Sequence, residues 1–344
     1  MGVMTQTPTA PPRPPAPAPP APTGRARAVL RALAIAACLP YVSLKAAWIA
    51  GSHIGVPAGS TLLDHRTAML VANSASVLLD CAVVVLALLL TRPWGRRVPA
   101  WLLTVPMWVA TGLLLPIMTG FPLQLLVKAC GGTTAGSGGH GRPFLDAWVY
   151  GVVYTGFIVQ GLTLGALFVL YARDRWSHLW QGGLSDLPQS PTGPALRLVA
   201  VVTSLLALVP GTVHLLWATG STAGLNETRI ADRTSDFYAL EAVYTVFTAV
   251  TVAGVLLLAL RRRGALALKV PLALAWAGSG VLGCWGGYLC IVALGPVDDI
   301  ADRPAAGMQL TYAVQMLVGI LVAATGAYFF AERAAATKPA GPSA

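Results

Sequence analysis

The chain has 344 residues, of which 56% are hydrophobic and only 10% are charged, and its mean hydropathy is +0.68. A soluble domain carries roughly 25% charged residues, so the composition excludes a soluble globular protein. The net charge of +10 at pH 7 leaves two interpretations, a nucleic-acid partner or a membrane-orientation signal.

Residues 1–31 are predicted to form a disordered cytoplasmic tail. The first 24 residues are rich in proline and alanine and offer no apolar face that folding would bury. The first apolar run starts only after Arg31 and is long enough to cross a bilayer, so the segment does not read as a signal peptide. Its PxxP spacings would suit a proline-recognition partner, although an inert tail is the simpler interpretation.

Eight apolar runs follow, each long enough to supply the roughly 20 residues that a helix needs to cross the hydrocarbon core. Backbone N–H and C=O groups must be satisfied internally there, so each run is predicted to be a helix. The expected fold class is an all-α, polytopic membrane protein with eight transmembrane helices. The predicted spans are 32–52, 68–91, 101–129, 146–171, 198–219, 236–260, 270–294 and 308–331.

Lysine and arginine are divided unevenly between alternate connections. The set formed by the N-terminal tail, the second and sixth connections, the 172–197 linker and the 332–344 tail holds sixteen, whereas the other set holds six. The positive-inside rule then places both termini and the linker in the cytoplasm, and nucleic acid is not expected as a partner. Nineteen arginines against four lysines suggest a GC-rich genome, so the expected location is a bacterial plasma membrane.

A stretch of the first span has a second copy in the fifth. VSLKAAWIAGSHIGV (42–56) aligns with PGTVHLLWATGSTAGL (210–225), and Lys45 then matches His214. The identical pairs in this alignment include Trp48 and Trp217, Gly51 and Gly220, and Gly55 and Gly224.

Further matches follow in the same order along the chain. They are Arg66-Thr67 with Arg233-Thr234, Val105-Pro106 with Val270-Pro271, and Arg142-Pro143 with Arg303-Pro304. The chain is therefore predicted to be a tandem 4+4 duplication, with membrane repeats over 32–171 and 198–331. Since four is even, both repeats enter the membrane in the same orientation, as a parallel repeat whose site would lie where the halves meet.

Ionisable side chains within the spans are the strongest functional candidates, because charge is costly in hydrocarbon. Four occur: Lys45, Asp80, His214 and Glu241. Lys45 and His214 each precede a matching glycine by six residues, which places them about 9 Å below the outer surface at 1.5 Å per residue. Glu241 lies at a similar depth, whereas Asp80 lies near the midplane.

Lys45 and His214 each also have an interpretation in which they serve the structure and not a function. The long stem of Lys45 would let its ammonium snorkel to the outer interface, and an isolated histidine is often a satisfied interior residue. Asp80 is too short to snorkel and would cost about 2.5–3.5 kcal/mol if left unpaired at a helix centre. Lys45 is a partner for Asp80 and His214 for Glu241, and the depths fit the second pair better.

Uncharged polar residues extend this outer-half group. Tyr154 on the fourth span and Gln315 on the eighth complete the predicted binding residues. Together they suggest a polar vestibule that opens outward between the repeats, although interfacial tyrosines explain such positions almost as well.

No metal or cofactor is expected. The five histidines form neither HxxxH nor HExxH, and only His214 lies deep enough in a span to ligate haem. The five cysteines form no CxxC; Cys130 and Cys290 lie near the outer face, where a disulfide between them is one alternative.

Three functions remain open. The first is a permease-like or small-solute-binding protein. The second is a structural or regulatory membrane subunit that contacts a protein partner through its N-terminal tail or central linker. The third, less favoured, is a membrane-embedded enzyme with a lipid-linked substrate, which would need converging acid–base groups. Convergence of Lys45, His214 and Glu241 on one cavity would favour the first function.

Overall fold

The computed structural model of the chain describes residues 23–58, 60, 66–133, 145–184, 192–231, 233–260, 266–295 and 302–336. Eight long helices cover most of these residues: α1 (Thr23–Ile49), α2 (Arg66–Thr91), α3 (Ala100–Ala129), α4 (Ala147–Trp180), α5 (Gly193–Ala218), α7 (Ser235–Leu260), α8 (Lys269–Val292) and α9 (Ala306–Ala336). All eight are long and apolar enough to cross a membrane, which confirms the prediction of a multi-pass helical architecture.

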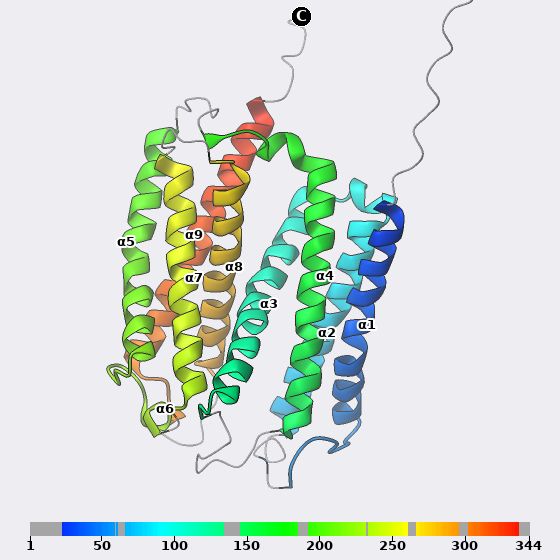
Figure 1. Cartoon of the computed structure of the whole chain (residues 1–344), viewed down its shortest axis with the longest axis vertical. Coiled ribbons are helices and arrows are strands. Elements are labelled where there is room, and N and C mark those ends of the chain that lie inside the picture. The colour runs from blue at the N-terminus through cyan, green and yellow to red at the C-terminus, as the bar shows by residue number, and fades with distance from the viewer. Residues whose placement is uncertain are drawn as a thin grey trace, which may run out of the picture.

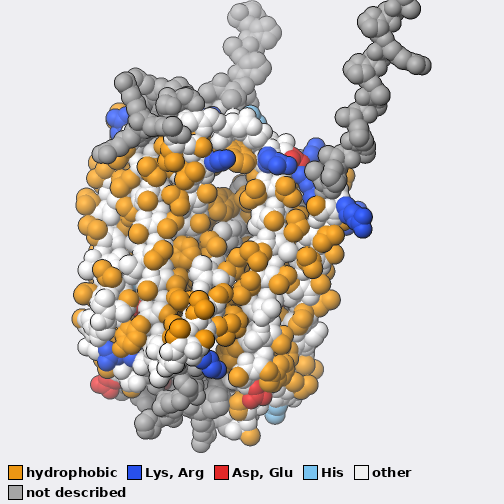
Figure 2. Space-filling view, in the orientation of Figure 1, with side chains coloured by type: hydrophobic (Ala, Val, Ile, Leu, Met, Phe, Trp, Pro, Cys, Tyr) orange, Lys and Arg blue, Asp and Glu red, His pale blue; other side chains and the backbone are white. Residues whose placement is uncertain are grey.

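Two short helices join the long ones, a 3-10 turn η2 (Pro93–Arg97) between α2 and α3 and α6 (Glu227–Ala231) between α5 and α7. Helix α3 continues through Pro106, Pro116 and Pro122, so the predicted third span is one helix. At most about one third of the residues in the apolar window of each of the first five spans is buried within the protein. Figure 2 shows the same distribution, with hydrophobic side chains over the middle of the molecule and charged ones gathered toward its two ends.

Helices α1 and α4 extend furthest beyond their predicted spans. Helix α1 begins at Thr23 rather than at residue 32, and α4 ends at Trp180 rather than at residue 171. The added turns contact each other, because the Arg27 guanidinium donates to the Asp174 carboxylate across 2.6 Å. The helical chain therefore continues past the apolar segment into the polar zone at the membrane surface. The predicted tails over residues 1–22 and 337–344 lie outside the described residues.

The far end of α4 is fixed to the turn between α2 and α3. The Tyr171 hydroxyl donates to the carbonyl oxygen of Gly95 across 3.0 Å, and Arg175 donates to the carbonyl oxygen of Val98 across 2.9 Å. The same guanidinium lies over the Trp176 ring. Trp176 is thus part of this joint, and it lies with Trp180 in the last turns of α4.

The long helices form two bundles (Figure 1). In the second bundle, α5, α7, α8 and α9 pack in a ring in which each helix contacts two neighbours, whereas in the first bundle α1 packs against α2 and α4, and α4 also packs against α3. The bundles meet where α3 packs against α8 and α7. The N-terminal end of α1 and the C-terminal end of α9 lie at the same end of the molecule (Figure 1).

Close backbone contact holds the two bundles together. A Cβ placed on Gly112 of α3 would lie 2.2 Å from the carbonyl oxygen of Gly280 of α8. Beside this contact, Trp108 donates its indole N–H to Ser279 across 3.0 Å. Lipid supplies no hydrophobic drive for helix association, so small residues and interhelical hydrogen bonds take that role.

Candidate functional site

Helices α1 and α5 end in turns with the same hydrogen bonds. The Trp48 indole N–H donates to the carbonyl oxygen of Ile54 across 2.7 Å, and Trp217 donates to that of Ala223 across 2.9 Å. Four glycines in these turns have positive φ, a conformation that only glycine adopts at little cost: Gly51 (90°), Gly55 (73°), Gly220 (101°) and Gly224 (78°). Both tryptophans are buried, so they close the turns instead of lying at the lipid surface.

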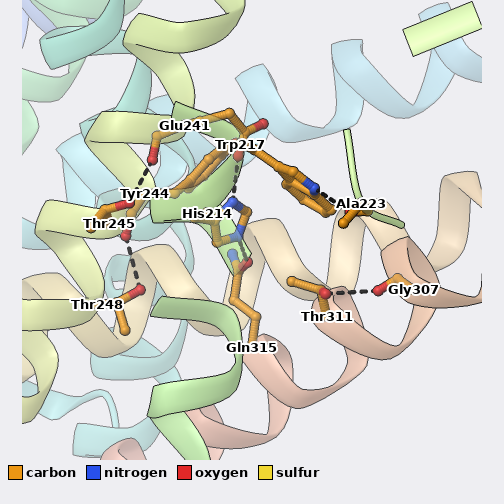
Figure 3. A network of polar contacts seen from close by, with 10 residues as sticks. All are labelled: His214, Trp217, Ala223, Glu241, Tyr244, Thr245, Thr248, Gly307, Thr311 and Gln315. Carbon is orange, nitrogen blue, oxygen red and sulfur yellow. Dashed lines mark hydrogen bonds and ion pairs between the residues drawn. The ribbon is translucent and has the colours of Figure 1, made fainter. Parts of the chain in front are cut away.

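His214 lies three residues before Trp217 and belongs to a hydrogen-bonded group, the second-half centre, with Glu241 and Gln315 (Figure 3). Its Nδ1 lies 2.5 Å from Glu241 Oε2, and its Nε2 lies 2.8 Å from Gln315 Oε1. The three residues come from α5, α7 and α9, and their exposed fractions are 1%, 7% and 1%. The expected pairing of His214 with Glu241 is present, and Gln315 joins it.

The hydrogen-bond roles define the charge of this centre. Gln315 is oriented with Oε1, an acceptor, toward His214 Nε2, and in this arrangement Nε2 carries a proton. The other nitrogen then either donates to an ionised Glu241 or accepts from a protonated one. Both arrangements place one proton between Nδ1 and Oε2, and the pair is neutral overall. Neutrality suits a buried position, because an uncompensated charge there is costly.

Aromatic rings enclose the second-half centre. The Trp217 ring meets the imidazole edge-on with centroids 5.5 Å apart, and the Tyr244 ring lies 5.1 Å away at a tilt of 34°. Tyr244 is itself buried and faces Trp285 of α8 at 6.4 Å. All four helices of the second bundle therefore contribute to the surroundings of His214.

Lys45 has a different partner from the one expected. Its ammonium donates to Asn73 Oδ1 of α2 across 2.8 Å and lies 4.8 Å and 5.0 Å from the ring centroids of Tyr41 and Trp48. These contacts hold the half-buried ammonium between α1 and α2. The expected ion pair of Lys45 with Asp80 is not formed. Asp80 lies on α2 two helical turns further from Lys45 than Asn73 does.

Asp80 contacts α4 instead. Its Oδ1 accepts a hydrogen bond from Gln160 Nε2 across 3.1 Å, and the same amide lies 3.1 Å from Cys38 Sγ of α1. We call Lys45, Asn73, Asp80 and Gln160 the first-half centre. Asn73 was not predicted as a site residue, although the sequence offered a signal: the predicted alignment of the two halves matches Glu241 near Ser74, the next residue along the chain.

The last of the predicted binding residues, Tyr154, lies outside both centres. Tyr154 packs edge-on against Phe121 of α3 with ring centroids 5.0 Å apart, and it belongs to the first bundle. Cys130 and Cys290 are free thiols, so the alternative of a disulfide between them is wrong.

The two centres occupy different bundles. Lys45 and Asp80 contact residues of α1, α2 and α4, whereas His214 contacts α7 and α9. Among the residues that the structure describes, no hydrogen bond or ion pair joins one centre to the other. The convergence of Lys45 with His214 and Glu241, which would have favoured a permease, is therefore not present among the described residues; each bundle has its own polar centre.

No protein-family model, curated protein or solved structure matches this chain.

Proposed function

We propose that this protein is a permease-like membrane protein that binds a small solute, with the His214–Glu241 pair carrying the proton that its cycle moves. The observation that carries the proposal is the 2.5 Å contact between His214 Nδ1 and Glu241 Oε2 in the interior of a membrane-spanning bundle. Ionisable pairs inside a membrane mark proton and substrate pathways, since their burial is otherwise costly.

The chemistry of the pair supports proton carriage. With Nε2 committed to Gln315, the shared proton is the one that can leave, and its loss would leave one net negative charge in a buried site. A positive group that approaches the pair would stabilise that state and promote release. Solute-driven rearrangement of the bundle and proton release would then be linked.

We further propose that the chain is a multi-pass protein of a bacterial plasma membrane, with both termini cytoplasmic. The uneven division of lysine and arginine supports this orientation. We also propose that the two halves arose by tandem duplication and lie parallel. The matching turns after α1 and α5 support the duplication, since the same glycine conformations and indole hydrogen bonds recur at matching positions.

A structural or regulatory subunit is the second candidate, with the N-terminal tail or the central linker as the proposed contact for a protein partner. The close approach of Gly112 to Gly280 favours it, because backbone contact between the bundles suits a rigid assembly. The enzyme alternative is less favoured, because both ring nitrogens of His214 are engaged and its imidazole packs against the Trp217 and Tyr244 rings.

Proton flux into liposomes tests the first candidate against the second. The full chain is reconstituted with an entrapped pH-sensitive dye, and the external pH is stepped with potassium and valinomycin present to carry compensating charge. We expect flux above that of empty liposomes, lost in Glu241→Gln and kept in Glu227→Gln, whose carboxylate is exposed on α6. Wild-type flux equal to that of empty liposomes would contradict proton carriage and favour the structural subunit.

A further inference from the structure

The first-half centre is a second polar group in the membrane interior, and proton carriage by His214 and Glu241 does not use it. Asn73 and Asp80 lie seven residues apart on α2, which is two turns along one helix face. Asn73 contacts Lys45 of α1, and Asp80 contacts Gln160 of α4. Both side chains therefore project from the face of α2 that contacts α1 and α4.

Each of these two side chains has one buried atom left over. Asn73 Oδ1 accepts from Lys45, and Asn73 Nδ2 has no partner among the described residues. Asp80 Oδ1 accepts from Gln160, and Asp80 Oδ2 is likewise unpaired within the described ranges. Both side chains are 4% exposed, so bulk water does not satisfy them, and a buried polar atom without a partner is costly.

The unpaired atoms differ in chemistry at the two ends of the centre. The outer end offers only donors, namely the Asn73 amide and the remaining N–H groups of the Lys45 ammonium. The inner end offers an acceptor, the free carboxylate oxygen of Asp80. A ligand that satisfies both ends therefore needs an anionic oxygen at one end and an N–H donor at the other.

Charge balance narrows the class of ligand further. Lys45 and Asp80 together are neutral, and a zwitterion adds no net charge to the membrane interior. A simple anion or a simple amine would leave one uncompensated charge there, which is costly. We propose that the first-half centre binds a small zwitterion, with its carboxylate at Lys45 and Asn73 and its ammonium at Asp80.

The spacing of the centre sets the length of this zwitterion. Seven residues of helix rise separate Asn73 from Asp80 by about 10 Å. Two hydrogen bonds of about 2.9 Å each leave about 5 Å between the ligand oxygen and nitrogen. An α-amino acid is too short for this gap, because its two charged groups share one carbon atom. An ω-amino acid with a few methylene groups, such as γ-aminobutyrate, fits it.

This inference rests on the proposed function in one respect, since it identifies the solute of the proposed permease. It assigns solute recognition to the first bundle and proton carriage to the second. The two assignments involve different residues and are measured separately.

Calorimetric titration of the purified full chain tests the inference with a series of probes. Glycine, β-alanine, γ-aminobutyrate and ε-aminocaproate vary the distance between the charges, and butyrate and butylamine each supply one charge alone. We expect binding to be strongest for γ-aminobutyrate or its nearest neighbour in the series, and at least about tenfold weaker for the single-charge probes, since each loses a charge-assisted contact.

Variants locate the binding. Lys45→Met and Asp80→Asn should each weaken binding of the best zwitterion by at least about tenfold, whereas Glu227→Gln should leave it unchanged. Thermal unfolding and gel filtration of each variant show whether it is folded, and Asn73→Leu provides a third variant that keeps both charges and should also weaken binding.

Each outcome bears on one proposal. Absence of binding for all four zwitterions, equal binding of butyrate, or full binding by folded Asp80→Asn would overturn the zwitterion site. Binding without proton flux in the same preparation supports the zwitterion site and contradicts the proposed proton carriage. Proton flux without binding of any zwitterion supports the proposed proton carriage and contradicts the zwitterion site.

Discussion

Trp48 and Trp217 each donate an indole N–H to the carbonyl oxygen of the residue six positions further along the chain. In both cases this bond closes the turn that ends a transmembrane helix and holds the Lys45 or His214 side chain one turn below it. The two polar centres therefore start from the same local structure, although their partners differ.

We expect Trp48→Phe and Trp217→Phe to lower the free energy of unfolding by similar amounts, about 1–3 kcal/mol each. The reason is that each substitution leaves a carbonyl oxygen, that of Ile54 or Ala223, without its donor. Reversible denaturation of the purified protein in mixed micelles provides the measurement. A loss in only one of the two variants would show that the turns are not energetically equivalent.

Gly112→Ala should weaken the contact between the bundles by about 1–3 kcal/mol, because the new Cβ would overlap the carbonyl oxygen of Gly280. Gly165→Ala is the matched control, since a Cβ at Gly165 of α4 meets nothing within 4 Å. It should be neutral or slightly stabilising, as alanine is the better helix former. The thermal unfolding midpoints of the two variants give the comparison, and equal midpoints would contradict the close contact.

Glu241→Gln and Glu241→Ala should separate proton carriage from packing. The glutamine keeps a donor for His214 Nδ1 and keeps the centre neutral, so we expect stability close to wild type together with loss of proton flux. The alanine leaves His214 Nδ1 buried without a partner and should cost about 1–3 kcal/mol. Denaturation and liposome flux are measured on the same preparations. Retained flux in the glutamine variant would remove Glu241 from the proton path.

Arg175→Ala should destabilise the junction of α4 with the α2–α3 turn. The guanidinium donates to the Tyr171 hydroxyl and to the carbonyl oxygen of Val98, and hydrogen bonds to charged groups contribute about 1.5–3 kcal/mol. Arg173→Ala is the control, since Arg173 lies half a turn away and its side chain is exposed. An equal effect in both variants would indicate a general charge effect instead of this junction.

Cys130 provides a test of the proposed orientation. It is an exposed free thiol at the end of α3, on the side proposed to face outward. We expect a membrane-impermeant maleimide to label Cys130 in intact cells. Arg25→Cys, at the other end of the molecule in a variant lacking Cys130 and Cys290, should be labelled only after the membrane is opened. The opposite pattern would reverse the orientation.

The sequence predicted the eight spans well, because apolar length is set by the bilayer itself. It predicted less well where helices end outside the hydrocarbon, as at Thr23 and Trp180. The apolar stretch of sequence ends before these residues, whereas helical hydrogen bonding and contacts such as that of Arg27 with Asp174 continue beyond it. The ends of membrane helices are therefore determined by side-chain contacts that a hydropathy pattern does not contain.

Pairs of polar side chains within the spans were predictable only where the two residues lie at the same depth and have complementary charge. His214 and Glu241 share a depth and have complementary chemistry, and they do pair. Lys45 was expected to pair with Asp80 because both carry charge, but Asn73 lies at its level on α2 and is uncharged. Asn73 and Asp80 lie on one face of α2, two turns apart, so depth along the helix decides which of them meets Lys45.

The single proton shared by His214 and Glu241 has an electrical consequence. As a neutral pair, the resting centre experiences no net force from the membrane voltage. Once the proton leaves, the site carries one negative charge, whose energy changes by up to about 2.3 kcal/mol per 100 mV according to how much of the field it senses. In the proposed cycle, voltage would therefore act on the deprotonated state alone, and resting and released forms would differ in their response to the energised membrane.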